Sequence, residues 1–153
     1  ARSLDERSPA QAIELGPMLQ ALAEDARDMG WTVRVPEDVR GRVVGNPSAL
    51  RRALWNLVEN AVKFGGEVEL TLACAGEQCE IRVRDHGPGL AEDELEKVFE
   101  PFYRTEASRN RETGGTGLGL AITRNLVHAQ GGAITLRNHP GGGLEAVLRL
   151  RAQ

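Results

Sequence analysis

Three groups of residues in this chain have types and spacings that suit chemistry on a phosphate-bearing ligand. In the first group, Asn56, Asn60 and Lys63 recur at i, i+4 and i+7, so a helix would place them along one face. Amide oxygens can ligate Mg²⁺, and a lysine ammonium can contact a phosphate. At the edge of a buried face, each of these groups needs a polar partner. Taken alone, the cluster is explained better by two asparagines that hydrogen-bond a neighbouring loop.

The second group is Asp-His-Gly-Pro-Gly at 85–89, directly after a predicted strand. A carboxylate at a strand end accepts hydrogen bonds, and the glycines Gly87 and Gly89 would let a flat ligand approach the backbone. A plain tight turn would explain this segment equally well.

The third group, Gly-Gly-Thr-Gly-Leu-Gly-Leu at 114–120, begins a predicted helix. Bare backbone N–H groups at a helix start form an anion site without needing a side chain. The segment lacks the Gly-Lys-Ser/Thr of a Walker loop and the glycine spacing of the dinucleotide-binding fingerprint. By itself it is weak evidence for a phosphate site.

A helix from Asn46 to Phe64 is predicted to carry the first group. Asn46 suits the N-cap, Pro47 suits the first helical position, and Gly65-Gly66 should end the helix. At about 100° per residue, one apolar stripe should face a sheet. Its members are Leu50, Leu54, Leu57 and Ala61.

Short strands and two further helices account for most of the remaining chain. Strands are expected at 13–15, 31–35, 43–44, 68–74, 80–85, 133–137 and 144–150, and helices at 16–30 and 117–130. Hairpins outnumber strand–helix–strand crossovers, which predicts an α/β (α+β) two-layer sandwich: a mixed, mostly antiparallel sheet of about five strands with three helices on one face. The last helix should turn Leu118, Ile122, Leu126 and Ala129 inward. The long connection at 86–115 is typical of a lid or a binding loop.

The amino-acid composition limits the classes of protein to which this chain can belong. The 153 residues, 41% hydrophobic and 27% charged, suit one globular domain, and the net charge of −3 disfavours direct nucleic-acid binding. No apolar run is long enough to span a bilayer.

Residues 1–10 are polar and aperiodic, so we interpret them as a linker from a missing domain, with the domain proper at 11–153. Cys74 and Cys79 match no disulfide framework or zinc motif, so we expect reduced thiols of a cytosolic protein.

Four motifs in this order resemble the ATP-binding catalytic domain of sensor histidine kinases. That domain belongs to the wider GHKL (Bergerat-type) ATP-binding family, shared with type II topoisomerases, Hsp90 chaperones and mismatch-repair ATPases. The motifs are Asn-Leu-Val-Glu-Asn-Ala-Val-Lys-Phe at 56–64 (N box), Asp-His-Gly-Pro-Gly at 85–89 (G1 box), Val-Phe-Glu-Pro-Phe at 98–102 (F box) and Gly-Thr-Gly-Leu-Gly-Leu at 115–120 (G2 box). The flanking elements suit the family's Bergerat fold, so the resemblance covers nearly the whole chain. The four motifs together are highly specific.

The resemblance implies a role for each residue of the first two boxes. Asn60 would support a Mg²⁺ ion bridging the phosphates, with Asn56 assisting one turn earlier, and Lys63 would contact a phosphate. These three would be the catalytic residues. Phe64 would pack against the nucleotide, and Asp85 would accept a hydrogen bond from the exocyclic amine of adenine.

Further residues would surround the nucleotide through their backbone or from a lid. An ATP lid would run from about residue 99 to 116, and its Arg104 and Arg109 would either meet the γ-phosphate or form a solvated face. His86 stands where relatives usually carry asparagine, and it would give binding a mild pH dependence. The remaining implied ATP-binding residues are Gly87, Gly89, Leu90, Gly115, Thr116, Gly117, Leu118, Gly119 and Leu120.

The residue type at position 56 distinguishes a kinase from an ATPase. Relatives that hydrolyse ATP resemble one another in placing a glutamate four residues before the Mg²⁺ asparagine, whereas an asparagine cannot serve as a general base. The resemblance therefore implies slow hydrolysis and transfer of the γ-phosphoryl group to a histidine on a separate domain, for relay to a response-regulator aspartate. An anti-sigma-factor-like serine kinase or a family ATPase is the first alternative, although both carry the missing glutamate. A degenerate scaffold is the second, disfavoured by the intact Asn60, Asp85 and G2 glycines.

The resemblance also implies cofactors and partners. The cofactors would be ATP and Mg²⁺, and the partners would be the dimerisation and histidine phosphotransfer domain of the same protein and a cognate response regulator. The usual acceptor pattern, His-Glu followed by Leu-Arg-Thr-Pro, is absent from these residues. The isolated domain is expected to be a monomer of a homodimeric protein, in the cytoplasm, as the cytoplasmic part of a membrane-bound sensor kinase.

Overall fold

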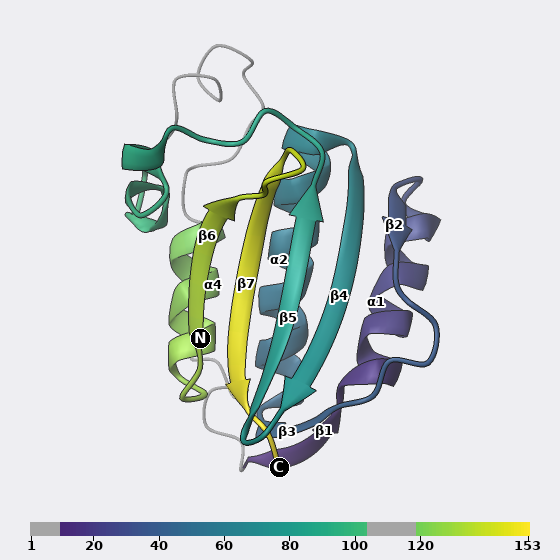
Figure 1. Cartoon of the computed structure of the whole chain (residues 1–153). Helices are drawn as coiled ribbons and strands as arrows, with labels where there is room; N and C mark the ends of the chain where they lie inside the picture. Colours follow the sequence, from purple (N-terminus) through teal and green to yellow (C-terminus); the bar gives the residue numbers. More distant parts are fainter. Residues whose placement is uncertain (1–9, 104–118) are drawn as a thin grey trace.

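The computed structural model describes residues 10–103 and 119–153, and these form a layer of helices on one face of a twisted sheet (Figure 1). The expected linker therefore lies almost wholly outside the described residues. The elements in chain order are β1 (Gln11–Glu14), α1 (Leu15–Asp28), β2 (Thr32–Arg34), β3 (Arg42–Gly45), α2 (Pro47–Gly65), β4 (Glu67–Ala75), β5 (Gln78–Asp85), the 3-10 turns η2 (Glu92–Glu94) and η3 (Lys97–Phe99), α4 (Gly119–His128), β6 (Ala133–Asn138) and β7 (Leu144–Arg151).

The main sheet has five strands in the order β2-β4-β5-β7-β6. β2 and β4 pair in parallel, and the other neighbours pair antiparallel. β1 and β3 form a separate antiparallel pair. The predicted two-layer, mostly antiparallel fold is confirmed. The described part of the connection expected at 86–115, residues 86–103, is less irregular than expected, because η2 and η3 occupy part of it.

Nearby residues in the sequence explain where α2, the helix at the centre of the helical layer, begins and ends and which face it buries. The Asn46 side chain accepts a 3.0 Å hydrogen bond from the Ala49 N–H, and Pro47 follows as the first helical residue. The helix ends at Gly65, and Gly66 has a φ of 77°, which favours glycine. The predicted inward stripe is confirmed: Leu50, Leu54, Leu57 and Ala61 are all buried in the core.

The inward face of α4 differs from the prediction. Leu126 is buried as expected, but Ala129, one residue past the end of the helix at His128, is exposed. The buried face includes Ala121 and Val127, and Leu118 lies outside the described residues. Among the described helices, none is both long and apolar enough to cross a membrane.

Cys74 and Cys79 form a disulfide, so the expectation of reduced thiols is wrong. The β4–β5 turn makes the two residues direct cross-strand partners, with Cα atoms 4.0 Å apart. The bond lies next to this turn, whereas Asp85 pairs with Val68 at the opposite end of the same hairpin.

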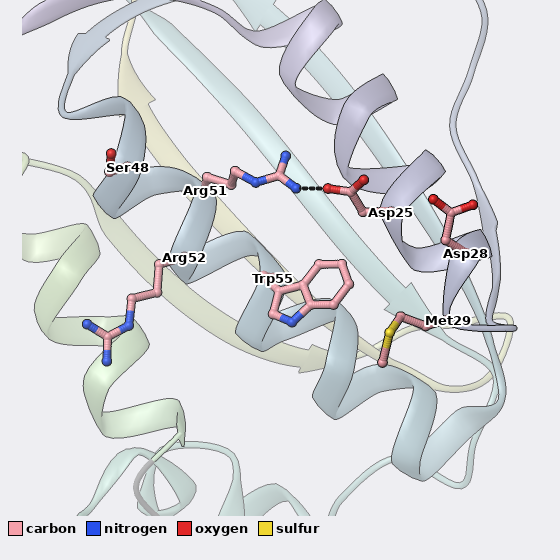
Figure 2. Close-up of a pocket in the computed structure, with 7 residues that line it drawn as sticks. All are labelled: Asp25, Asp28, Met29, Ser48, Arg51, Arg52 and Trp55. Atoms are coloured by element: carbon pink, nitrogen blue, oxygen red, sulfur yellow. Dashed lines mark hydrogen bonds and ion pairs between the residues drawn. The ribbon is translucent and has the colours of Figure 1, made fainter.

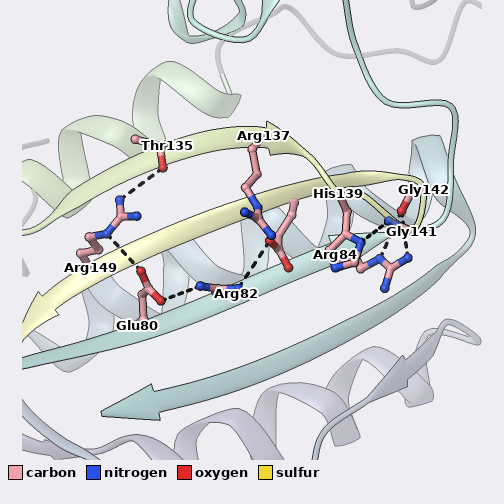
Figure 3. Close-up of polar contacts among 10 residues, drawn as sticks. Glu80, Arg82, Arg84, Thr135, Arg137, His139, Gly141, Gly142 and Arg149 are labelled. Atoms are coloured by element: carbon pink, nitrogen blue, oxygen red, sulfur yellow. Dashed lines mark hydrogen bonds and ion pairs between the residues drawn. The ribbon is translucent and has the colours of Figure 1, made fainter. Parts of the chain in front are cut away.

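Ion pairs cover the sheet face that the helices leave open (Figure 3). Glu80 accepts from Arg82 at 2.9 Å and from Arg149 at 3.1 Å. The hydrogen bond from Arg82, helped by the charge of both arginines, holds the pKa of the Glu80 carboxyl below its ordinary value against the opposing effect of burial. Glu145 is buried beneath the arginines and pairs with Arg137 at 2.7 Å. The arginine side chains of these ion pairs are partly exposed, so this face of the sheet is charged.

Candidate functional site

The N box and the G1 box meet where α2 ends beside the end of β5, in the upper part of Figure 1. A Cβ atom placed on Gly65 would lie 2.4 Å from the Asp85 Cβ and 2.8 Å from the Gly87 nitrogen. A Cβ atom on Gly87 would lie 2.4 Å from the Phe64 carbonyl oxygen. Two glycines thus permit a backbone approach that larger residues would prevent, and the two motifs become neighbours.

Asp85 supplies a buried carboxylate at this junction, with the residue only 3% exposed. Its Oδ1 accepts hydrogen bonds from the backbone N–H groups of Gly87 and Leu144, each 2.9 Å long. Within the described residues no donor reaches Oδ2. A buried carboxylate held by one oxygen can accept a further hydrogen bond at the other, which suits the amine of a flat ligand.

Asn56, Asn60 and Lys63 lie on α2, the two asparagines half-buried and the lysine exposed. In the described part of the chain, neither asparagine side chain has a hydrogen-bond partner, so the loop-bonding interpretation finds no support there. Their amide oxygens fit a ligand role for Mg²⁺. No cluster of three or more His, Cys, Asp or Glu residues suits a metal within residues 10–103 and 119–153, so an ion here would rely on amides and phosphate oxygens.

The F box attaches the segment after the G1 box to α4. Phe99 is 1% exposed, and the Arg124 guanidinium of α4 lies 4.8 Å from the centre of its ring. Arg124 also donates a 2.8 Å hydrogen bond to Glu96. Phe102 is different: it has a φ of 66° and is 69% exposed.

Most of the predicted lid and most of the G2 box lie outside the described residues. This concerns Arg104, Arg109, Gly115, Thr116, Gly117 and Leu118. Gly119 and Leu120 begin α4, where the Thr123 hydroxyl donates a 2.8 Å hydrogen bond to the Gly119 carbonyl. Of the predicted lid, only its first residues, up to 103, are described.

Three contacts at the junction involve residues that sequence reasoning did not assign to the site. Gly65 was predicted only as a helix end, and Asn138 and Leu144 only as parts of a hairpin. Leu144 holds Asp85, and the Asn138 side chain binds both backbone groups of Leu90. The Gly-rich turn at 140–143 was the available signal, because glycines permit close backbone contact.

A groove of about 610 Å³ between α1 and the first turns of α2 is separate from this junction (Figure 2). An ion pair between Arg51 and Asp25 joins the two helices across it. The lining residues are Asp25, Asp28, Met29, Ser48, Arg51, Arg52 and Trp55. None of them is a predicted site residue.

Comparison with known proteins gives consistent matches. Residues 45–153 match the family described as histidine kinase-, DNA gyrase B-, and HSP90-like ATPase. The sensor histidine kinase CpxA of Escherichia coli K12 is 42% identical over 136 residues, which cover 87% of this chain and 30% of CpxA. This chain therefore spans under a third of the length of that relative.

Two solved structures share the fold. The ATP-binding domain of PrrB from Mycobacterium tuberculosis has a TM-score of 0.78 and 31% identity, over 95% of this chain and 99% of that one. Full-length ShkA, crystallised with AMPPNP, has a TM-score of 0.78 and 29% identity, over 94% of this chain and 31% of that one.

Proposed function

Because this chain belongs to the histidine kinase-, DNA gyrase B- and HSP90-like ATPase family and is a histidine kinase catalytic domain, we propose that it binds Mg-ATP and donates the γ-phosphoryl group to a histidine of a separate dimerisation domain. One observation carries the proposal: Asp85, whose Oδ2 has no hydrogen-bond partner among the described residues, lies directly against the end of the helix that bears Asn56 and Asn60.

Asp85 would select the base. Its Oδ1 is held by two backbone N–H groups, which leaves Oδ2 to accept from the exocyclic amine of adenine. Guanine carries an oxygen at the equivalent position, and two acceptors facing each other are unfavourable. Gly87, Gly89 and Leu90 would border the base, and Phe64 would pack against the nucleotide.

The polar face of α2 would hold the phosphates. Asn60, with Asn56 one turn earlier, would ligate Mg²⁺ through the amide oxygens, and Lys63 would contact a phosphate. When bound, the ion would neutralise charge on the phosphates. Both amides are half-buried and have no hydrogen-bond partner within residues 10–103 and 119–153, which supports this assignment.

Phosphoryl transfer would depend on positioning more than on a protein base. The acceptor imidazole nitrogen would form a bond to the γ-phosphorus as the bond to the ADP oxygen breaks, with the reacting groups held in line. Asn56 cannot deprotonate water, so hydrolysis would be slow and ATP would persist until the acceptor arrives. In the serine-kinase and ATPase alternatives a glutamate would be expected in place of Asn56.

The partners and location follow as further parts of the proposal. The acceptor would be the dimerisation and histidine phosphotransfer domain of the same protein, with relay to an aspartate of a response regulator. The name of CpxA, a sensor histidine kinase, supports this assignment. The domain itself would be monomeric within a homodimeric, membrane-bound kinase, on the cytoplasmic side where ATP is available.

Phosphorylation of the full-length protein with ATP labelled in the γ-phosphate tests the proposal. We expect label on the protein that is stable in alkali and lost in acid, as a phosphoramidate should be, and absent from the Asn60→Ala variant. Acid-stable label would instead indicate a serine kinase. Rapid release of inorganic phosphate without protein labelling would indicate an ATPase.

A further inference from the structure

Two residues that face each other at the turn end of the β6–β7 hairpin hold the two ends of the segment 85–90. Asn138 and Leu144 are cross-strand partners. The Leu144 N–H donates a 2.9 Å hydrogen bond to Oδ1 of Asp85, at the start of the segment. The Asn138 side chain binds Leu90 at its end.

The contact between Asn138 and Leu90 uses both functions of one amide. Asn138 Oδ1 accepts from the Leu90 N–H at 2.9 Å, and Nδ2 donates to the Leu90 carbonyl at 2.7 Å. The side chain thus pairs with Leu90 as a neighbouring strand would. Gly89 has a φ of 77°, and a Cβ atom there would lie 2.4 Å from Asn138 Oδ1, so the glycine is needed for this approach.

The hairpin that presents Asn138 is itself held firmly. The His139 N–H donates to the Gly143 carbonyl at 2.8 Å. The Arg84 guanidinium donates to the Gly142 carbonyl at 3.0 Å (Figure 3). A Cβ atom at Gly143, whose φ is 88°, would lie 1.9 Å from the Asp85 carbonyl oxygen. The turn therefore packs on Asp85 without an intervening side chain.

We propose that Asn138 is a positioning residue for adenine recognition. By fixing Leu90, it keeps the segment 85–90 in the shape that presents Asp85 Oδ2 to the base. It acts through Asp85 and Leu90 and needs no contact with the nucleotide. The inference rests on the proposed function, because it assumes that Asp85 accepts from adenine, and it adds a determinant outside the four motifs.

Two variants separate positioning from mere stability. Asn138→Ala removes both hydrogen bonds. Asn138→Asp is nearly isosteric and can still accept from the Leu90 N–H, but it cannot donate to the Leu90 carbonyl. It also adds negative charge beside Glu92, whose carboxylate lies 3.4 Å from Asn138 Nδ2 in the unaltered protein. Asn125→Ala is the matched control, since Asn125 is exposed on α4.

Calorimetry with Mg-ATP and Mg-GTP, together with amide exchange of Leu90 without nucleotide, tests the inference. In both Asn138 variants we expect about tenfold weaker ATP binding, a smaller preference for ATP over GTP and faster exchange at Leu90, with the control unchanged. Melting curves identify which variants are folded. If Asn138→Ala does not fold, the binding and exchange of Asn138→Asp decide the test.

The binding measurements separate a failure of the proposed function from a failure of the role proposed for Asn138. If the unaltered protein binds no ATP, the proposed function fails. If it binds ATP and the folded Asn138 variants keep the same ATP-to-GTP preference, the proposed function stands and the role of Asn138 is overturned.

Discussion

Gly65 packs directly on Asp85: a Cβ atom at Gly65 would lie 2.4 Å from the Cβ of Asp85. The contact joins the last residue of α2 to the last residue of β5. It places the helix that carries Asn56 and Asn60 against the carboxylate expected to select the base. The distance between the phosphate end and the base end of the candidate site therefore depends on the absence of a side chain at residue 65.

Gly65→Ala should weaken both stability and ATP binding. The added methyl group forces α2 away from β5, which we expect to cost about 1–3 kcal/mol in the free energy of unfolding. The control is Gly30→Ala: Gly30 has a φ of 87° and open space around it, so this variant adds backbone strain without a clash. Thermal denaturation and calorimetry would measure the two effects. If Gly65→Ala bound ATP as tightly as the Gly30→Ala control, the contact would not shape the site.

Asp85→Asn should reduce ATP affinity while the fold is kept. Asparagine can still accept from the Gly87 and Leu144 N–H groups through its oxygen, but it turns its amide NH₂, a donor, toward the adenine amine, which is also a donor. We expect a loss of about tenfold or more in the affinity measured by calorimetry. Asp93→Asn, at an exposed position in η2, is the control. An unchanged affinity in Asp85→Asn would refute the assignment of the adenine acceptor.

Asn60→Ala should remove the dependence of ATP binding on Mg²⁺. The amide oxygen is the ligand that the variant lacks, and we expect binding in Mg²⁺ to weaken by about tenfold, or about 1.4 kcal/mol. Titrations with Mg²⁺ and with a chelator, on both proteins, give the comparison. A variant whose affinity still responded to Mg²⁺ as before would place the metal site elsewhere.

Features that depend on neighbouring residues in the sequence could be predicted. The N-cap Asn46 and the buried stripe of α2 follow from local spacing, as does the order of hairpins that gave the two-layer fold. α4 ends at His128 rather than at the predicted residue 130, and Ala129, predicted to face inward, is exposed.

Contacts between distant segments could not be predicted from local pattern. Leu90 and Asn138 are 48 residues apart, and they meet only because β7 pairs with β5 and β6 pairs with β7. The Cys74–Cys79 disulfide depends likewise on the register of one hairpin, since its spacing matches no motif. The roles implied for Asn56, Asn60, Lys63 and Asp85 came from resemblance and stay predictions.

Reduction of the Cys74–Cys79 disulfide should lower stability without changing nucleotide affinity. Loop-closure entropy for so short a loop predicts a loss of about 2 kcal/mol in the free energy of unfolding. The bond lies at the far end of the β4–β5 hairpin from Asp85, so the site should be unaffected. Melting curves and ATP titrations with and without reductant, and with the Cys74→Ser/Cys79→Ser double variant, provide the measurement. A parallel loss of ATP affinity would show that the hairpin couples the two ends.

Phosphorus NMR of this domain with Mg-ATP, followed over hours, tests whether the domain binds ATP without hydrolysing it. We expect the ATP resonances to shift or broaden as the nucleotide binds, and no inorganic phosphate to accumulate, because Asn56 cannot activate water. Steady growth of the inorganic phosphate resonance at a catalytic rate would contradict this expectation and make the domain an ATPase.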